Sequence, residues 1–203
     1  VAKMTVRPRS ASQCIVDPNS RRVNAFAGQL AMAGQAPRAV NLLRDWLRDH
    51  PDDGSGWSYL GMLHQQQGQD TQALEAYEQA LEHSEPNPVI LNNMAWMYLG
   101  RDDARAQELA TRAYELAPSR AEIVDTYGWV LFKTGRRNDG LAALQQALII
   151  APRNAEIALH VAEALHAMAR DAEARPMLER IVREQPNSDF ARSARELLGR
   201  LRG

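Results

Sequence analysis

Apolar residues recur along the chain with the spacing of one face of an α-helix, in segments of about 12 residues that come in pairs. The two segments of a pair are joined by a turn rich in glycine or aspartate, such as QGQD at 67–70 or TGRR at 134–137. Asp70, Asp102 and Asp171 follow such turns, where a carboxylate can accept hydrogen bonds from the unpaired N–H groups of a helix start. The pattern predicts an all-α chain without strands.

The helix pairs repeat with a period of 34 residues. Pro118, Pro152 and Pro186 are 34 residues apart, and a proline at this place ends the second helix of a pair. With that proline as position 32, and with one-residue shifts near Pro86 and Arg101, positions 8 and 20 are small in every unit. They are Ala27, Gly61, Ala95, Gly128 and Ala162, then Ala39, Ala73, Ala106, Gly140 and Ala174. Bulky residues there would hold the helices apart, at a cost on the order of 1–3 kcal/mol.

This period divides the chain into an array, because a single pair cannot bury its apolar face alone and must stack on neighbours. We place five repeat units between residues 20 and 187, at 20–53, 54–87, 88–120, 121–154 and 155–187. Residues 188–203 carry one apolar stripe and four arginines mostly off it, which is typical of a capping helix. Residues 1–19 are an N-terminal extension or a truncated preceding repeat. Residues 10–18 resemble the end of the second helix of such a repeat, so we expect further repeats upstream.

The unit resembles the tetratricopeptide repeat (TPR), most clearly in segment 57–81. Residues that match the family's consensus positions are Trp57, Leu60, Gly61, Gly68, Ala73, Tyr77 and Ala80. His64 stands where tyrosine is usual. The resemblance covers all five units. It implies a right-handed α-solenoid of about five helix pairs, in which the first helix of each pair lines a concave groove that binds a protein or peptide segment.

The resemblance also implies which residues face that groove, chiefly those at positions 5, 9 and 12. They include Asn24, Met62, Asn92, Trp96, Asp125, Trp129, Phe132, Glu163 and His166. Trp96 and Trp129 occupy position 9 of adjacent units, flanked by Asn92 and Asp125. Two interpretations stay open: the tryptophans pack sideways between neighbouring helices, or they form an aromatic strip for a partner, since tryptophan is favoured at interaction hot spots.

Some TPR proteins hold the C-terminal carboxylate of a chaperone with groove lysines and asparagines. The only lysines here are Lys3 and Lys133, and neither occupies the required position. A clamp of that kind is therefore not expected.

Other functional classes find little support. The net charge of −1 does not favour nucleic acid, and no apolar run approaches the roughly 20 residues that cross a bilayer. The single cysteine, Cys14, excludes an intramolecular disulfide, which fits the cytoplasm and equally a periplasmic protein. His160, Glu163 and His166 share one helix but spread around it and lack a fourth ligand, so we expect no metal. We expect no cofactor and no enzymatic activity.

Two motifs allow a narrower comparison. NNMAW at 92–96 and DTYGW at 125–129 are similar to the C-terminal repeats of bacterial TPR proteins of the PEP-CTERM/exosortase system, which accompany exopolysaccharide export. This likeness implies a periplasmic or outer-membrane-associated scaffold, with the cytoplasm as the alternative. Two alternative functions stay open: sugar rings of a polysaccharide stacking on Trp96 and Trp129, and self-association through the N-terminal end.

Overall fold

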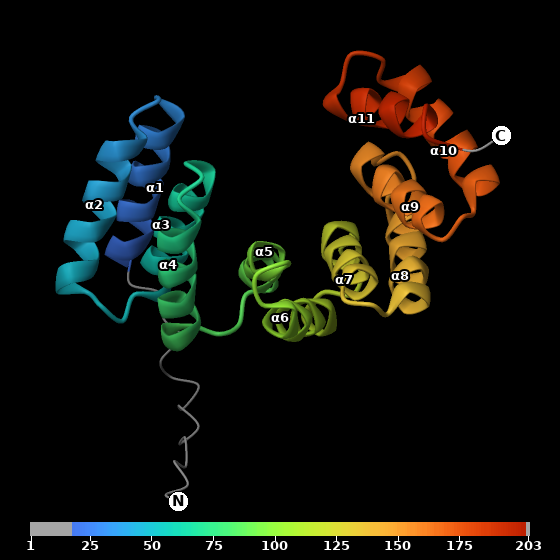
Figure 1. Ribbon diagram of the computed structural model, residues 1–203. Helices are drawn as coiled ribbons and strands as arrows, with labels where there is room; N and C mark the ends of the chain where they lie inside the picture. Colours follow the sequence, from blue (N-terminus) through green and yellow to red (C-terminus); the bar gives the residue numbers. More distant parts are fainter. Residues whose placement is uncertain (1–17, 202–203) are drawn as a thin grey trace, which may run out of the picture. The chain divides into compact units, whose positions relative to one another are not determined.

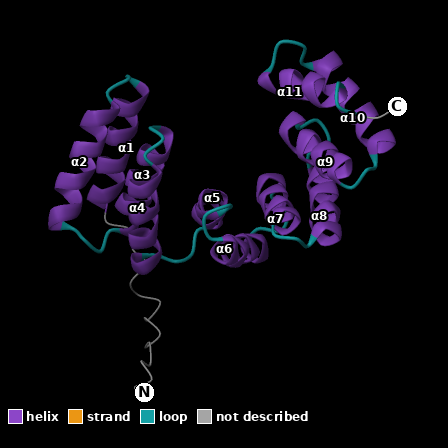
Figure 2. Cartoon of the chain, in the orientation of Figure 1, coloured by secondary structure: helices purple, strands orange, loops and turns teal. Residues whose placement is uncertain are grey.

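A computed structural model of the protein describes residues 18–201. Over this range the chain forms eleven helices joined by turns and loops, and it contains no strand (Figure 2). The predicted all-α fold is therefore confirmed for these residues. Cys14 and most of the predicted N-terminal extension lie outside the described range. The chain divides into two compact units, unit 1 (Val1–Pro86) and unit 2 (Asn87–Gly203).

Unit 1 contains two helix pairs (Figure 1). Its helices are α1 (Pro18–Met32), α2 (Ala36–Asp49), α3 (Gly54–Gln66) and α4 (Asp70–His83). Leu43, Leu60 and Leu63 are buried in its core. The Asp53 carboxylate begins α3 by accepting hydrogen bonds from two backbone N–H groups of the first turn, 3.0 and 3.1 Å away, and also from the Trp46 indole at 2.7 Å. This cap ties the end of the first pair to the start of the second.

Unit 2 contains three helix pairs and a single last helix (Figure 1). Its helices are α5 (Pro88–Tyr98), α6 (Asp103–Leu116), α7 (Ala121–Lys133), α8 (Arg137–Ile150), α9 (Ala155–Ala167), α10 (Asp171–Glu184) and α11 (Asp189–Leu198). α11 packs on α9 and α10 and buries Ala191, Ala194 and Leu197. This arrangement confirms the predicted α-solenoid of helix pairs with a capping helix.

The pair α7–α8 illustrates why small residues recur at positions 8 and 20. A Cβ atom on Gly128 would lie 2.7 Å from the backbone nitrogen of Leu144. On Gly140 it would lie 2.5 Å from the backbone nitrogen of Phe132. Real Cβ atoms do not approach so closely, so glycine at both positions lets the two backbones meet. The close approach fixes the helix that carries Asp125, Trp129 and Phe132.

One predicted detail of the helix starts is wrong. Asp102 is an N-cap, and its side chain accepts a hydrogen bond from the Arg105 backbone. Asp70 and Asp171 are instead the first helical residues of α4 and α10. Each comes two residues after a residue with positive φ, Gly68 or Ala169, that ends the preceding helix. Before α6 the residue with positive φ is Gly100, and the helix begins three residues after it instead of two. Asp102 therefore precedes the first helical residue and is the N-cap.

None of the helices between residues 18 and 201 is both long and apolar enough to cross a membrane.

Candidate partner-binding site

Three aromatic side chains from three successive first helices meet in unit 2. Trp96 comes from α5, Trp129 from α7 and His160 from α9; we call them the tryptophan–histidine cluster. The Trp129 and His160 rings stack with centroids 4.7 Å apart and planes inclined by 21°. Trp96 approaches the same imidazole at 5.8 Å. The cluster therefore links three repeats, and it leaves Trp96 43% exposed.

The imidazole of this cluster is held by a buried carboxylate. His160 Nδ1 lies 2.8 Å from Asp125 Oδ2, and the two side chains are 12% and 8% exposed. Burial is the strongest single influence on the pKa of His160 and lowers it. The hydrogen bond and charge of Asp125, together with the charges of Glu156 and Glu163, outweigh burial and raise the pKa above its ordinary value. Folding therefore favours protonation of His160.

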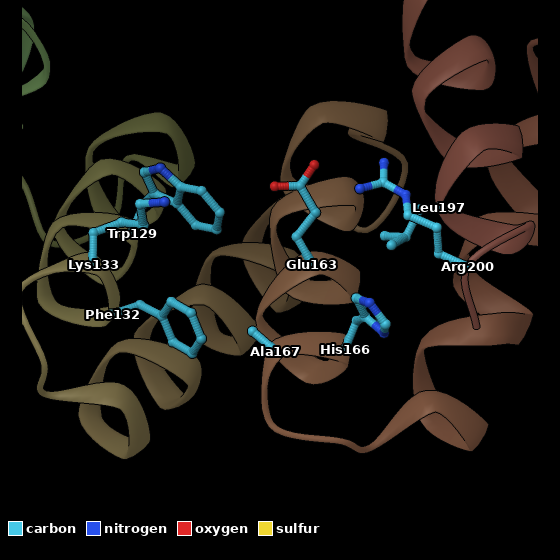
Figure 3. A pocket seen from close by; sticks show the side chains of 8 residues that line it. All are labelled: Trp129, Phe132, Lys133, Glu163, His166, Ala167, Leu197 and Arg200. Atoms are coloured by element: carbon cyan, nitrogen blue, oxygen red, sulfur yellow. The ribbon is translucent and has the colours of Figure 1, made fainter. Parts of the chain in front are cut away.

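Beside the cluster, a pocket of about 310 Å³ opens between α7, α9 and α11; we call it the end pocket. Its lining consists of Trp129, Phe132, Lys133, Glu163, His166, Ala167, Leu197 and Arg200 (Figure 3). Figure 3 shows the rings of Trp129 and Phe132 on one side and Leu197 on the other, with the Glu163 carboxylate between Trp129 and Arg200. An apolar interior with a few charged groups is the usual composition of a binding site.

Cationic side chains surround the aromatic wall of this pocket. The Lys133 ammonium lies 5.4 Å from the centroid of Trp129, and the Arg137 guanidinium lies 6.0 Å from that of Phe132. Such contacts attract the cation to the face of the ring. No carboxylate among residues 18–201 forms an ion pair with Lys133, Arg137 or Arg200.

The nine predicted groove residues lie in different surroundings. Asn24 and Met62 lie in unit 1, and the other seven lie in unit 2. Trp129, Phe132, Glu163 and His166 line the end pocket, and the neighbouring Trp96 joins the tryptophan–histidine cluster. Phe132 is also part of the core, with 7% of its surface exposed.

The position 5 residues differ from the expectation that they face the groove. Asp125 is buried against His160, and the Asn24 amide donates a hydrogen bond to Ser55 Oγ at 3.0 Å. Asn92 is half-buried, and its amide oxygen is enclosed. Asn24 and Asp125 each form a hydrogen bond with a residue of the next first helix, which gives these enclosed polar side chains a partner. They join adjacent repeats rather than lining an open surface.

Sequence reasoning considered His160 only as a metal ligand and omitted Lys133, Leu197 and Arg200 from the site. His160 contacts Asp125, whereas His166 contacts Asp171 at 2.7 Å, so the two imidazoles are held by different carboxylates. No group of three or more histidine, cysteine, aspartate or glutamate side chains in the described part of the chain is placed to hold a metal ion. One feature of the sequence could have indicated the contact between Asp125 and His160: they are 35 residues apart, which is one repeat plus one residue.

Comparison with known proteins identifies the repeat. Two family models, both of the tetratricopeptide repeat, match residues 54–87 and 131–201. The chain belongs to the tetratricopeptide repeat family. The "TPR repeat-containing protein PA4667" of Pseudomonas aeruginosa is 27% identical over 139 residues, which cover 68% of this chain. The matched part is 23% of that protein's length.

Solved TPR structures share the fold. A chain of MamA from Desulfovibrio magneticus RS-1 that runs from residue 41 to its end superposes with a TM-score of 0.73 at 14% identity, over 86% of this chain and 99% of that one. YrrB, described as a TPR protein with an unusual peptide-binding site, superposes with a TM-score of 0.70 at 17% identity, over 93% of this chain and 98% of YrrB. At such identities the likeness is one of fold. The TPR is in general a non-catalytic scaffold that binds proteins or peptides.

Proposed function

We propose that the chain is a non-catalytic TPR scaffold that binds a protein segment on α5, α7 and α9 of unit 2. The observation that carries the proposal is Trp96, which keeps 43% of its surface exposed while its ring is held against His160. A tryptophan that is already ordered loses little rotamer freedom when a partner covers it. Aromatic residues of this kind supply most of the binding energy at many interfaces. The peptide-binding site attributed to YrrB fits this use of the fold.

Selection from a random peptide display library against the intact chain tests the proposal. Trp96→Ala should weaken binding of a selected peptide on the order of ten- to thirty-fold, the effect of losing a hot spot. Leu116→Ala is the matched control, because Leu116 on α6 is an exposed apolar residue (53%) outside the cluster. Equal affinities for wild type and Trp96→Ala, with unchanged thermal stability, would contradict the assignment.

We further propose that this scaffold serves bacterial exopolysaccharide export in the periplasm or at the outer membrane. The support is the pair of motifs NNMAW and DTYGW, which contribute Trp96 and Trp129 to the cluster. Fractionation of the native host with an antibody against the chain tests the compartment. Deletion of the gene should reduce secreted polysaccharide, and recovery of the chain only with cytoplasmic markers would count against the proposal.

A polysaccharide is the second candidate ligand for the same surface, favoured by the exposed ring of Trp96. Sugar rings can stack on such a face, whereas a peptide needs side-chain pockets as well. Titration of the intact chain with exopolysaccharide fragments, compared with Trp96→Ala, distinguishes the two. A fluorescence change that saturates in wild type alone would favour the glycan over the peptide.

Self-association through the N-terminal end is a third possibility, and the segment concerned lies almost wholly outside the described residues. Light scattering of the intact chain over a range of concentrations tests it directly. A constant monomer mass would exclude it.

A further inference from the structure

We infer that the end pocket takes one large apolar side chain of the bound segment, and that Lys133 and Arg200 contact acidic residues next to that side chain. The inference rests on the proposed function, because it describes the chemistry of the segment bound on unit 2. It names a class of partner: a protein segment with an apolar anchor in an acidic context.

The apolar half of the inference follows from the walls of the pocket. Trp129 and Phe132 stack with centroids 6.1 Å apart and form one wall, and Leu197 of α11 lies opposite (Figure 3). The volume of about 310 Å³ is at the lower end of the range for ligand pockets, so it suits one large side chain rather than a cofactor. Burial of an apolar group against these walls stabilises the complex in proportion to the apolar area that is removed from water.

The acidic half follows from the charges at the pocket. Lys133, Arg137 and Arg200 are exposed, and none has a carboxylate partner among residues 18–201. His166 is held by Asp171. Of these cations, Lys133 and Arg200 line the pocket, and Glu163 is the one lining carboxylate, so the lining has a net charge of about +1 apart from the His166–Asp171 pair. Unpaired cations around an apolar pocket attract acidic groups and orient them.

The arrangement favours an internal side chain over a bare terminal carboxylate. Lys133 and Arg200 line the pocket and are exposed, so water reaches their charges. A carboxylate placed between Trp129 and Leu197 would lose its hydration and would meet the Glu163 carboxylate, which already lies between Trp129 and Arg200 (Figure 3). An apolar group in the pocket with carboxylates outside it satisfies both parts of the site.

Selection from a random peptide display library against the intact chain shows which residues the end pocket prefers in a bound segment, without assuming a sequence. Wild type should enrich peptides that carry an aromatic or aliphatic residue beside aspartate or glutamate. A Lys133→Glu, Arg200→Glu variant should lose this acidic preference. Thermal melts of the variant confirm that it is folded, which is expected because both side chains are exposed.

Affinities for one selected acidic peptide, measured by fluorescence anisotropy, give the sharper test. Lys133→Gln and Arg200→Gln should each weaken binding by about two- to five-fold, the usual effect of one exposed charge pair. Glu163→Gln should strengthen binding, because it removes the repulsive carboxylate. Arg153→Gln is the matched control: it removes an exposed charge beside the start of α9, whereas the pocket lies at the helix end.

The outcomes separate this inference from the proposed function. Peptides that bind and are lost in Trp96→Ala, but that carry no acidic residues or are unaffected by the pocket variants, would overturn the inference alone. Weaker binding in Glu163→Gln would also overturn it, because the pocket would then recognise a basic group. Absence of any enriched peptide would overturn the proposed function, and the inference with it.

Discussion

Replacing Asp125 by asparagine tests how the seam between α7 and α9 is held. The His160–Asp125 contact is 2.8 Å long, and its side chains are 12% and 8% exposed. Asparagine keeps the volume but removes the charge that His160 faces. Leaving one ion of a buried pair uncompensated costs about 3–5 kcal/mol. Because His160 can avoid part of this cost by losing its proton, we expect a loss of about 2–3 kcal/mol near pH 6.

The size of this loss should depend on pH in a defined direction. The pKa of folded His160 is raised, whereas that of an unfolded histidine is about 6.5. A raised pKa contributes stability that is fully present below the unfolded pKa and is lost as pH rises through the folded pKa. The difference between wild type and Asp125→Asn should therefore shrink as pH rises through the pKa of folded His160, to roughly 1 kcal/mol, because asparagine Oδ1 still accepts from the neutral imidazole and only the charge assistance of one hydrogen bond is lost.

Urea denaturation followed by circular dichroism, near pH 6 and at a pH above the pKa of folded His160, measures the difference. Asp171→Asn is the matched control, because the His166–Asp171 pair is 2.7 Å long but its side chains are 33% and 14% exposed, more than those of His160 and Asp125. Solvent weakens a more exposed pair, so we expect a smaller loss for this variant. Equal losses for the two variants, or a loss for Asp125→Asn that is the same at both pH values, would refute the reasoning.

Two further substitutions test the local packing of unit 2. Gly140→Ala should destabilise the chain by about 1–3 kcal/mol in thermal melts despite the higher helix propensity of alanine, because the new Cβ would lie 2.5 Å from the Phe132 backbone nitrogen. Gly199→Ala, whose Cβ would meet nothing closer than 3.6 Å, should be neutral, and similar melts for both would contradict the account. Asn154→Ala should cost about 1 kcal/mol, since its side chain accepts two backbone hydrogen bonds at the start of α9; an unchanged urea midpoint would contradict this.

The fold could be predicted from the sequence because its determinants recur at fixed positions. Gly61 is small because a Cβ there would lie 2.5 Å from the Tyr77 ring, and Gly128 is small because Leu144 is close. The alanines at position 8 of the other units, Ala27, Ala95 and Ala162, are fully buried, so the small residue recurs with the packing of the helix pair. The aspartates near the helix starts were harder to place, because one added residue in the turn before α6 decides whether an aspartate is the N-cap or the first helical residue.

The end pocket could be predicted only in part, because its last wall does not belong to the repeat. Trp129, Phe132, Glu163 and His166 stand at positions 9 and 12, which the resemblance to the TPR implies face the groove. Leu197 comes from α11, which is not a first helix of any pair, and Arg200 comes from the turn after it, so no repeat position points to either residue. Lys133 was excluded by comparison with a different clamp, although it follows directly after Phe132.

The residues at position 5 show what the repeat period cannot predict. A period places a side chain on a face of its helix, but it does not say whether the next helix covers that face. In unit 1, Asn24 bonds to Ser55, 31 residues later; in unit 2, Asp125 bonds to His160, 35 residues later. The different separations mean that different positions of the next helix supply the partner. A substitution at position 5 therefore acts on the seam between repeats, whereas Trp96, one turn further along its helix, makes the direct contact with a partner that we propose.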